Sequence, residues 1–186
     1  MRRETEDVEE KLSRRMKAEA VGLGLCAEWT ADWSDGTDRD GLVRKFVRGI
    51  DFCIEHDWPS VDVMKRDFGD VIHRHGVYAD ENVEASDAPL VVLNGECVGD
   101  ISYGGTTAGE VYVRHKSEAR VRVGGAARAF VSVYDEGEVS VECEDGAKCF
   151  VYLHGGKVRK TRGDVAVRDR RNMSKMRKEG DGNEKK

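Results

Sequence analysis

Residues 121–150 read VRVGGAARAF VSVYDEGEVS VECEDGAKCF, and the first ten residues return in altered form as the last ten. The pattern extends in both directions, because Val or Ile occupies every tenth position from Val91 to Val151. Segments that begin at Val111, Val131 and Val151 form a second set, which alternates with the first. The chain therefore carries a repeat of twenty residues, with two strand-like segments in each unit.

Glycine-rich turns such as Gly104-Gly105 and Gly124-Gly125 separate these segments, which is typical of short strands. Each residue of a stacked coil lies above its counterpart one turn later, so a β-solenoid explains a side-chain repeat of twenty residues. A meander or sandwich remains the alternative, because each turn can also close a hairpin. We expect an α+β fold in which an N-terminal helical segment precedes a short β-solenoid of about four coils of about twenty residues.

Three segments divide the chain. Residues 1–82 are predicted to be mainly helical, and the clearest helix covers residues 41–57, with an apolar stripe of Leu42, Val43, Phe46, Val47, Ile50 and Ile54. Thr37 or Asp38 is the expected cap of this helix. Residues 83–170 hold the solenoid. Residues 171–186 contain six Lys/Arg, three Asp/Glu and no large branched or aromatic residue, which predicts a disordered tail.

Composition describes a soluble protein with a modest core, since 39% of the residues are hydrophobic and 36% are charged. No apolar run approaches the ~18 residues of a membrane span, and no apolar signal core follows the charged N-terminus. Five cysteines, an odd number, indicate a reducing compartment and a cytoplasmic location. Cys143 and Cys149 fall on inward positions of the repeat and are expected to be buried thiols.

Four segments carry a resemblance: residues 24–29 (GLCAEW), 49–60 (GIDFCIEHDWPS), 92–99 (VLNGECVG) and 165–170 (VAVRDR). With these segments the chain resembles uncharacterised proteins of gut Bacteroidales and their prophages, from about residue 22 to residue 170. The resemblance implies a phage or mobile-element setting, and a virion-associated location if a phage encodes the protein. It carries no established activity and assigns no site residue.

Successive side chains of a strand point to opposite faces of the sheet, so every second side chain lies on the outer surface of the solenoid. One outer surface collects aromatic side chains, and these are the candidate binding residues: Tyr112, Phe130, Tyr134, Phe150, Tyr152 and His154. Arg114 is expected on the same surface. Contiguous apolar patches of this kind mark interfaces, and the N-terminal helices, a second copy of the chain or an external partner are the three candidates to cover it.

The remaining polar groups favour structural roles. On the other outer surface, Arg122, Glu142 and Arg162 would stack with alternating charge. His73 and His75 could form half of a metal site, but no further metal ligand stands nearby in the sequence. His115 and Asp135 would be neighbours on successive coils, but no Ser or Cys is placed to act as their nucleophile. We therefore expect no metal and no cofactor, and we assign no catalytic residue.

These observations favour a non-enzymatic structural or protein-interaction module that binds a protein partner or self-associates. A carbohydrate-binding or carbohydrate-active β-helix protein is the first alternative, but four coils span only ~15–20 Å. The paired carboxylates that glycoside cleavage needs are not evident in the sequence. A nucleic-acid-associated protein is the second alternative. Since the net charge is −5, nucleic acid could bind only through the basic residues of the tail, 171–186.

Overall fold

The computed structural model describes residues 2–172, with side chains from Asp7 onwards. Of the tail expected at residues 171–186, all but the first two residues lie outside the described residues. The chain divides into two compact units between His75 and Gly76. The boundary expected at residues 82/83 falls inside a strand, Asn82–Ser86, because the solenoid begins earlier than the repeat in the sequence indicates.

Helices and helical turns build the first unit: α1 (Arg2–Gly22), α2 (Ala27–Ala31), α3 (Arg39–Arg48), α4 (Ile50–Glu55), α5 (Val61–Val63), η1 (Met64–Phe68) and η2 (Gly69–His75). The single helix expected over residues 41–57 is interrupted at Gly49, which separates α3 from α4. Asp38 caps α3, and its carboxylate accepts a hydrogen bond of 2.8 Å from the backbone N–H of Gly41.

The core of this unit comes mainly from one face of α1 and one face of α3. Buried side chains include Leu12, Met16, Ala20, Trp33, Leu42, Val43, Phe46, Phe68 and Ile72. The indole N–H of Trp33 donates a hydrogen bond of 3.1 Å to the buried hydroxyl of Ser13, so the polar atom of the largest core side chain is satisfied.

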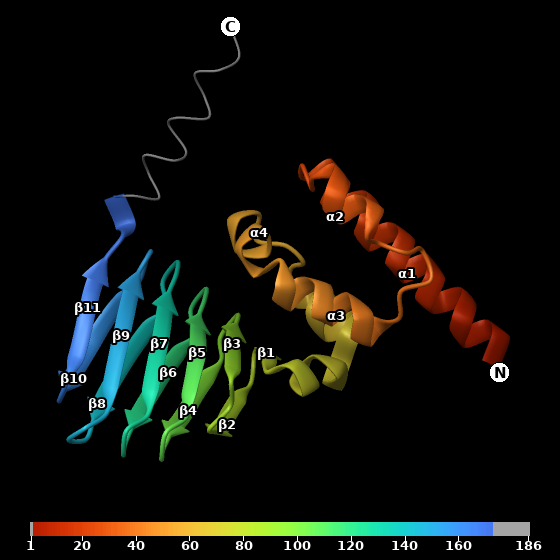
Figure 1. The fold of residues 1–186 in the computed structure, drawn as a ribbon. Helices are drawn as coiled ribbons and strands as arrows, with labels where there is room; N and C mark the ends of the chain where they lie inside the picture. Colours follow the sequence, from red (N-terminus) through yellow and green to blue (C-terminus); the bar gives the residue numbers. More distant parts are fainter. Residues whose placement is uncertain (1, 173–186) are drawn as a thin grey trace, which may run out of the picture. The chain divides into compact units, whose positions relative to one another are not determined.

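The second unit is a parallel β-solenoid (Figure 1). Its strands are β1 (Val77–Ala79), β2 (Asn82–Ser86), β3 (Leu90–Asn94), β4 (Val98–Tyr103), β5 (Ala108–Val113), β6 (Glu118–Val123), β7 (Arg128–Val133), β8 (Glu138–Cys143), β9 (Lys148–Leu153), β10 (Lys157–Arg162) and β11 (Val165–Asp169). Odd-numbered strands form sheet A in the order β1-β3-β5-β7-β9-β11, and even-numbered strands form sheet B in the order β10-β8-β6-β4-β2. Successive strands thus alternate between the sheets, and the expected solenoid is confirmed, because a meander would pair successive strands antiparallel.

Register follows the twenty-residue repeat in the central coils. Val111 pairs with Val131, and Val131 pairs with Val151, so the three valines are superposed as the repeat predicts. The terminal coils are shorter: Val77 pairs with Val92, and Val165 pairs with Cys149. In the first coil the spacings are fifteen residues in sheet A and sixteen in sheet B, where Asn82 pairs with Val98, which explains why this coil left no trace in the repeat.

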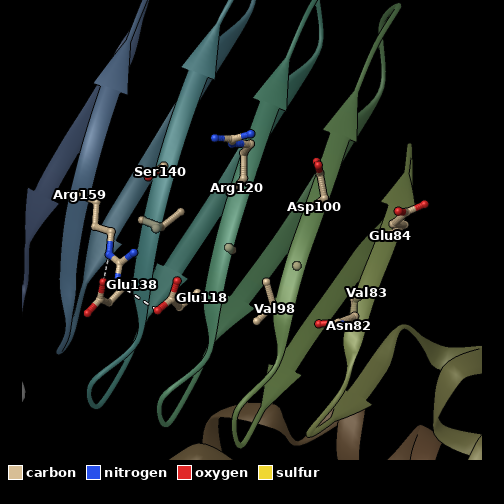
Figure 2. A pocket seen from close by; sticks show the side chains of 13 residues that line it. Asn82, Val83, Glu84, Val98, Asp100, Glu118, Arg120, Glu138, Ser140 and Arg159 are labelled. Atoms are coloured by element: carbon tan, nitrogen blue, oxygen red, sulfur yellow. Dashed lines mark hydrogen bonds and ion pairs between the residues drawn. The ribbon is translucent and has the colours of Figure 1, made fainter.

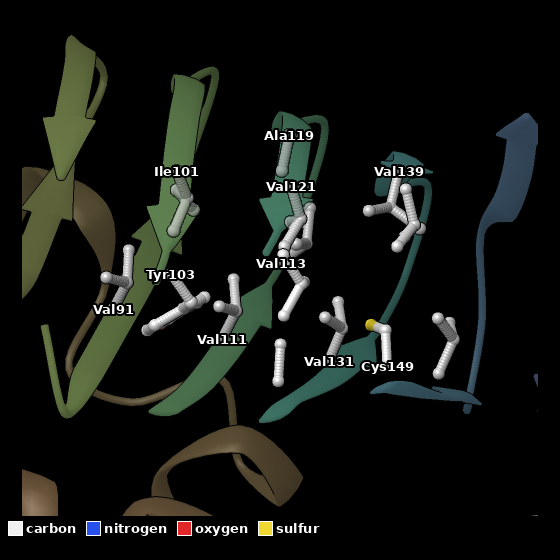
Figure 3. Packing of buried hydrophobic residues seen from close by; sticks show 14 of the residues in the cluster. Val91, Ile101, Tyr103, Val111, Val113, Ala119, Val121, Val131, Val139 and Cys149 are labelled. Atoms are coloured by element: carbon white, nitrogen blue, oxygen red, sulfur yellow. The ribbon is translucent and has the colours of Figure 1, made fainter. Parts of the chain in front are cut away.

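The solenoid core lies between the two sheets, and the side chains that fill it point toward one another in Figure 3. The inward valines Val111, Val121, Val131, Val141 and Val151 are completely buried. Cys143 and Cys149 are buried as expected.

Small residues make room for large ones in the same interior. A Cβ atom on Gly109 would lie 2.3 Å from Cε1 of Tyr103, so the inward-facing Tyr103 ring requires glycine on the next strand of the coil. The same inward position holds Ala119 and Ala129 in the following strands. The size of the side chain at this position is therefore matched to its neighbours in the core.

Val131→Asp should destabilise the solenoid by about 3 kcal/mol or more, because it buries an unpaired carboxylate among valines. Ser132→Asp is the matched control: its half-exposed side chain points outward, and a change below about 1 kcal/mol is expected. Urea titration of both variants measures the difference. Equal losses would contradict the inward and outward assignment.

Burial raises the pKa of the Cys149 thiol from 9.0 to about 12. The unfolded chain therefore releases this proton at a lower pH than the folded chain does. The free energy of unfolding should fall as the pH rises from about 9 to about 12, by up to about 1.4 kcal/mol per pH unit for this one proton. Cys149→Ala removes the contribution, so urea titrations over this range should show a shallower loss for the variant. Equal slopes would contradict the burial of the thiol.

Candidate binding face on sheet A

The six aromatic candidates lie together on the outer surface of sheet A. Phe130 belongs to β7, Phe150 and Tyr152 belong to β9, and Tyr112 belongs to β5. Tyr134 and His154 directly follow β7 and β9. We call this set, Tyr112, Phe130, Tyr134, Phe150, Tyr152 and His154, the aromatic face. The strands place it by alternation, because their buried residues Val131, Val133, Val151 and Leu153 point into the core.

The rings of the aromatic face stack on one another from strand to strand. Phe130 and Phe150 are register partners, with ring centroids 5.3 Å apart and an interplanar angle of 12°. Tyr134 stacks on Tyr112 at 6.4 Å and on His154 at 4.6 Å. In-register parallel strands stack Phe130 on Phe150 and Tyr134 on His154, because they hold equivalent side chains about 4.8 Å apart. Tyr112 is the register partner of Ser132, so its contact with Tyr134 is diagonal.

Several rings of the aromatic face are partly covered by a neighbour. Phe130 and Phe150 stack on each other, His154 stacks on Tyr134, and the guanidinium carbon of Arg170 lies 4.2 Å from the centroid of the Tyr152 ring. These contacts each occupy one face of the ring concerned. Phe130 nevertheless remains 36% exposed, a large value for a Phe side chain.

Arg114 corrects the expectation that it would lie exposed beside Tyr112. Its side chain is only 1% exposed, and Nη1 donates a hydrogen bond of 2.9 Å to Oδ1 of Asn94 in the preceding coil. Asn94 in turn donates from Nδ2 to the carbonyl oxygen of Tyr78 at 3.0 Å. The sequence held a signal for this network, since Asn94 stands twenty residues before Arg114.

His115 and Asp135 are neighbours as expected, but through the backbone. The N–H of His115 donates to Oδ2 of Asp135 at 3.0 Å, and the ring Nδ1 of His115 accepts from the N–H of Gly95 at 2.9 Å. Both residues have positive φ angles, 55° and 52°, in equivalent turns. The contacts hold the turns of three successive coils together, so this pair has a structural role.

The two other histidine candidates lie in the helical unit. Nε2 of His75 lies 2.8 Å from Oδ1 of Asp40, and this hydrogen bond lowers the pKa of the Asp40 carboxyl. Among the described residues, no group of three or more His, Cys, Asp or Glu side chains is arranged to hold a metal ion.

Sheet B carries a shallow groove of about 710 Å³ on its outer surface (Figure 2). Arg159 contacts carboxylates of two successive coils there, at 3.0 Å from Glu118 and also with Glu138. Glu118 and Glu138 are register partners, a pair of neighbouring carboxylates that the sequence analysis missed although they stand twenty residues apart. The Arg159 contacts make them part of an ion-pair network across the coils, at exposed positions where each pair contributes little stability.

The alternating charge column expected on sheet B is confirmed in register. Arg122 pairs with Glu142, and Glu142 pairs with Arg162 as strand partners. The close ion pair of Arg122 is with Asp100, however, at 2.7 Å. Asp100 stands diagonally on the preceding strand, within reach of a long side chain.

Comparisons with protein families, curated proteins and solved structures found no match to this chain. Within the described part of the chain, no helix combines the length and the apolar character that crossing a membrane requires.

Removing both phenyl rings should reveal the energy of the Phe130–Phe150 stack. In a double-mutant cycle of Phe130→Ala and Phe150→Ala, we expect a coupling of about 0.5–1.5 kcal/mol in the free energy of unfolding. The control cycle combines Phe130→Ala with Ser140→Ala on sheet B, where coupling should stay below about 0.5 kcal/mol. Equal coupling in the two cycles would contradict the ladder.

Proposed function

We propose that this protein is a non-enzymatic protein-interaction module, and that its solenoid binds another protein surface through the aromatic face. The carrying observation is that aromatic rings gather and stack on one outer sheet surface, with Phe130 still 36% exposed. Aromatic side chains on one sheet surface suit the side chains of a protein partner, and aromatic residues are enriched in such interfaces.

Rigidity supports this role. The strands that carry the aromatic face are paired on both sides in parallel register, and their inner side chains are buried. The face is therefore already in its binding arrangement before a partner arrives. A rigid surface loses little conformational entropy on binding, which favours affinity.

The polar groups give less support to an enzyme. His115 stabilises turns through its backbone N–H and its Nδ1 atom, and Arg159 contacts both Glu118 and Glu138. A carbohydrate-binding role also has less support, because sugars stack on ring faces, and the Phe130–Phe150, Tyr134–His154 and Tyr152–Arg170 contacts each occupy one such face. The alternative of nucleic-acid binding through residues 171–186 falls almost entirely outside the described residues.

The biological setting is part of the proposal and rests on the resemblance alone. Similarity to proteins of gut Bacteroidales and their prophages supports a phage or mobile-element origin. A cytoplasmic or virion-associated location, where partner proteins are abundant, fits an interaction module.

A photo-cross-linking amino acid at Ser132 tests the proposal, because Ser132 stands between Tyr112 and Tyr152 in register. On irradiation in the native host, we expect a discrete product that contains a second polypeptide. The matched control is the same amino acid at Ser140, a half-buried serine on the outer surface of sheet B. Phe130→Glu in the Ser132 background should lower the yield of the product about fivefold or more.

Mass spectrometry of the product decides between the candidates for this surface. A different protein or a second copy of the chain supports the proposal. Cross-links from Ser132 to residues 41–57 of the same chain would show that the N-terminal helices cover the face, and the proposal would then be wrong. Equal products from Ser132 and Ser140, or none from Ser132, would also overturn it.

A further inference from the structure

The last coil of the solenoid leaves two strand edges open within the described residues. β11 is the final strand of sheet A, and β10 is the final strand of sheet B. A strand at the edge of a sheet presents unpaired N–H and C=O groups, which form a template for a further strand. The two edges differ in how far they permit such pairing.

β10 has the features that protect an edge. Its pairing with β8 is irregular between Val158 and Lys160, a bulge that interrupts the backbone pattern. It also carries four cations in six residues, Lys157, Arg159, Lys160 and Arg162. Bulges and Lys or Arg side chains are common means by which proteins keep a further strand from adding to an edge.

β11 has no bulge, and it carries one cation, Arg168, in five residues. All five of its residues pair with β9 in uninterrupted register, from Val165 opposite Cys149 to Asp169 opposite Leu153. Val165 and Val167 continue the inward columns of Cys149 and Val151. Among the described residues no strand follows β11 in sheet A, and Val167 is 45% exposed. A further strand beside β11 would bury this side chain and pair the open backbone groups together.

Charge identifies the chemistry of the missing strand. Residues 157–172 contain seven Lys/Arg and two Asp/Glu, although the whole chain has a net charge of −5. Several of these cations are engaged: Lys157 and Arg159 pair with Glu138, and Arg171 pairs with Asp169. Arg168 is exposed on β11 next to Val167, and it forms no ion pair among the described residues. A carboxylate on an added strand would reach it.

We propose that the free edge of β11 binds an extended acidic segment of a partner protein as an additional strand of sheet A. An apolar side chain of this segment would lie over Val167, and a carboxylate would lie beside Arg168. Backbone hydrogen bonds supply the affinity in this mode, and alternate side chains supply the specificity. The site lies at the end of the solenoid and does not depend on the aromatic face.

Two other occupants are disfavoured by charge. A second copy that paired through its own β11 would bring two coils together, each with an excess of five cations. Residues 173–186, which follow the coil in sequence, contain five Lys/Arg and three Asp/Glu and so have the same sign as the coil. An acidic segment of another protein is the complementary partner.

The test titrates the full-length protein with a capped peptide of about eight residues that alternates Val with Glu. Three peptides serve as controls: one alternates Val with Lys, one is oligoglutamate of the same length, and one is N-methylated along the edge that would pair. We expect binding of the Val/Glu peptide by fluorescence anisotropy, with slower amide exchange in residues 165–169. Each control should bind at least about tenfold more weakly, since it lacks the charge, the apolar side chains or the backbone donors.

Two protein variants locate the site. Arg168→Glu and Val167→Lys should each weaken binding of the Val/Glu peptide about tenfold or more, because one reverses the charge and the other places a cation in the inward column. Arg162→Glu is the matched control on β10, with the same change of charge, and should alter the dissociation constant less than about threefold. Both target side chains are exposed, so circular dichroism should show that each variant folds.

Several outcomes overturn the proposal. Absence of peptide binding at about millimolar concentration would do so, as would equal effects of Arg168→Glu and Arg162→Glu. Equal binding of oligoglutamate or of a single-stranded oligonucleotide would indicate a general polyanion surface instead. If sedimentation shows a dimer that Val167→Lys dissociates, the occupant is a second copy of the chain. None of these results bears on cross-linking from Ser132, so the two proposals fail independently.

Discussion

In-register superposition of the coils is the constraint on which the rest of this solenoid depends. Val111, Val131 and Val151 lie one upon another, as do Val121 and Val141, so the same apolar position is filled in coil after coil. The same register brings outward side chains into columns. Ring ladders on sheet A and the alternating charges of Arg122, Glu142 and Arg162 on sheet B are therefore products of one backbone arrangement.

The sequence predicts those features of the fold that recur with the twenty-residue register. Val or Ile at every tenth position gave the strands, their inward parity and the position of the aromatic face. The first strand and the last strand of sheet A were not predictable in the same way, because their spacings of fifteen and sixteen residues break the period. Arg159 was also out of reach: its contact with Glu118 joins residues 41 apart and depends on a long side chain that crosses a coil. Similarly, the apolar stripe over residues 41–57 did not reveal the interruption at Gly49.

The two proposed binding surfaces of the solenoid differ in physical character. The aromatic face offers side chains on strands that are paired on both sides, so shape and apolar contact would select a partner there. The edge of β11 offers backbone groups, with Val167 and Arg168 beside them, so an extended conformation and acidic charge would be selected. Burial of Arg114 against Asn94 shows that not every cation near the aromatic face is free to take part.

The twenty-residue register also restricts how such a chain can change its length. Insertion of a single residue within a strand would turn its inward side chains outward and misalign them with both neighbouring strands. Insertion of a whole coil leaves every stacking relation intact, because a new valine lies between two old ones and a new ring lies between two old rings. The chain can therefore gain or lose outer surface only in steps of one coil, and each step lengthens the aromatic face without altering its width.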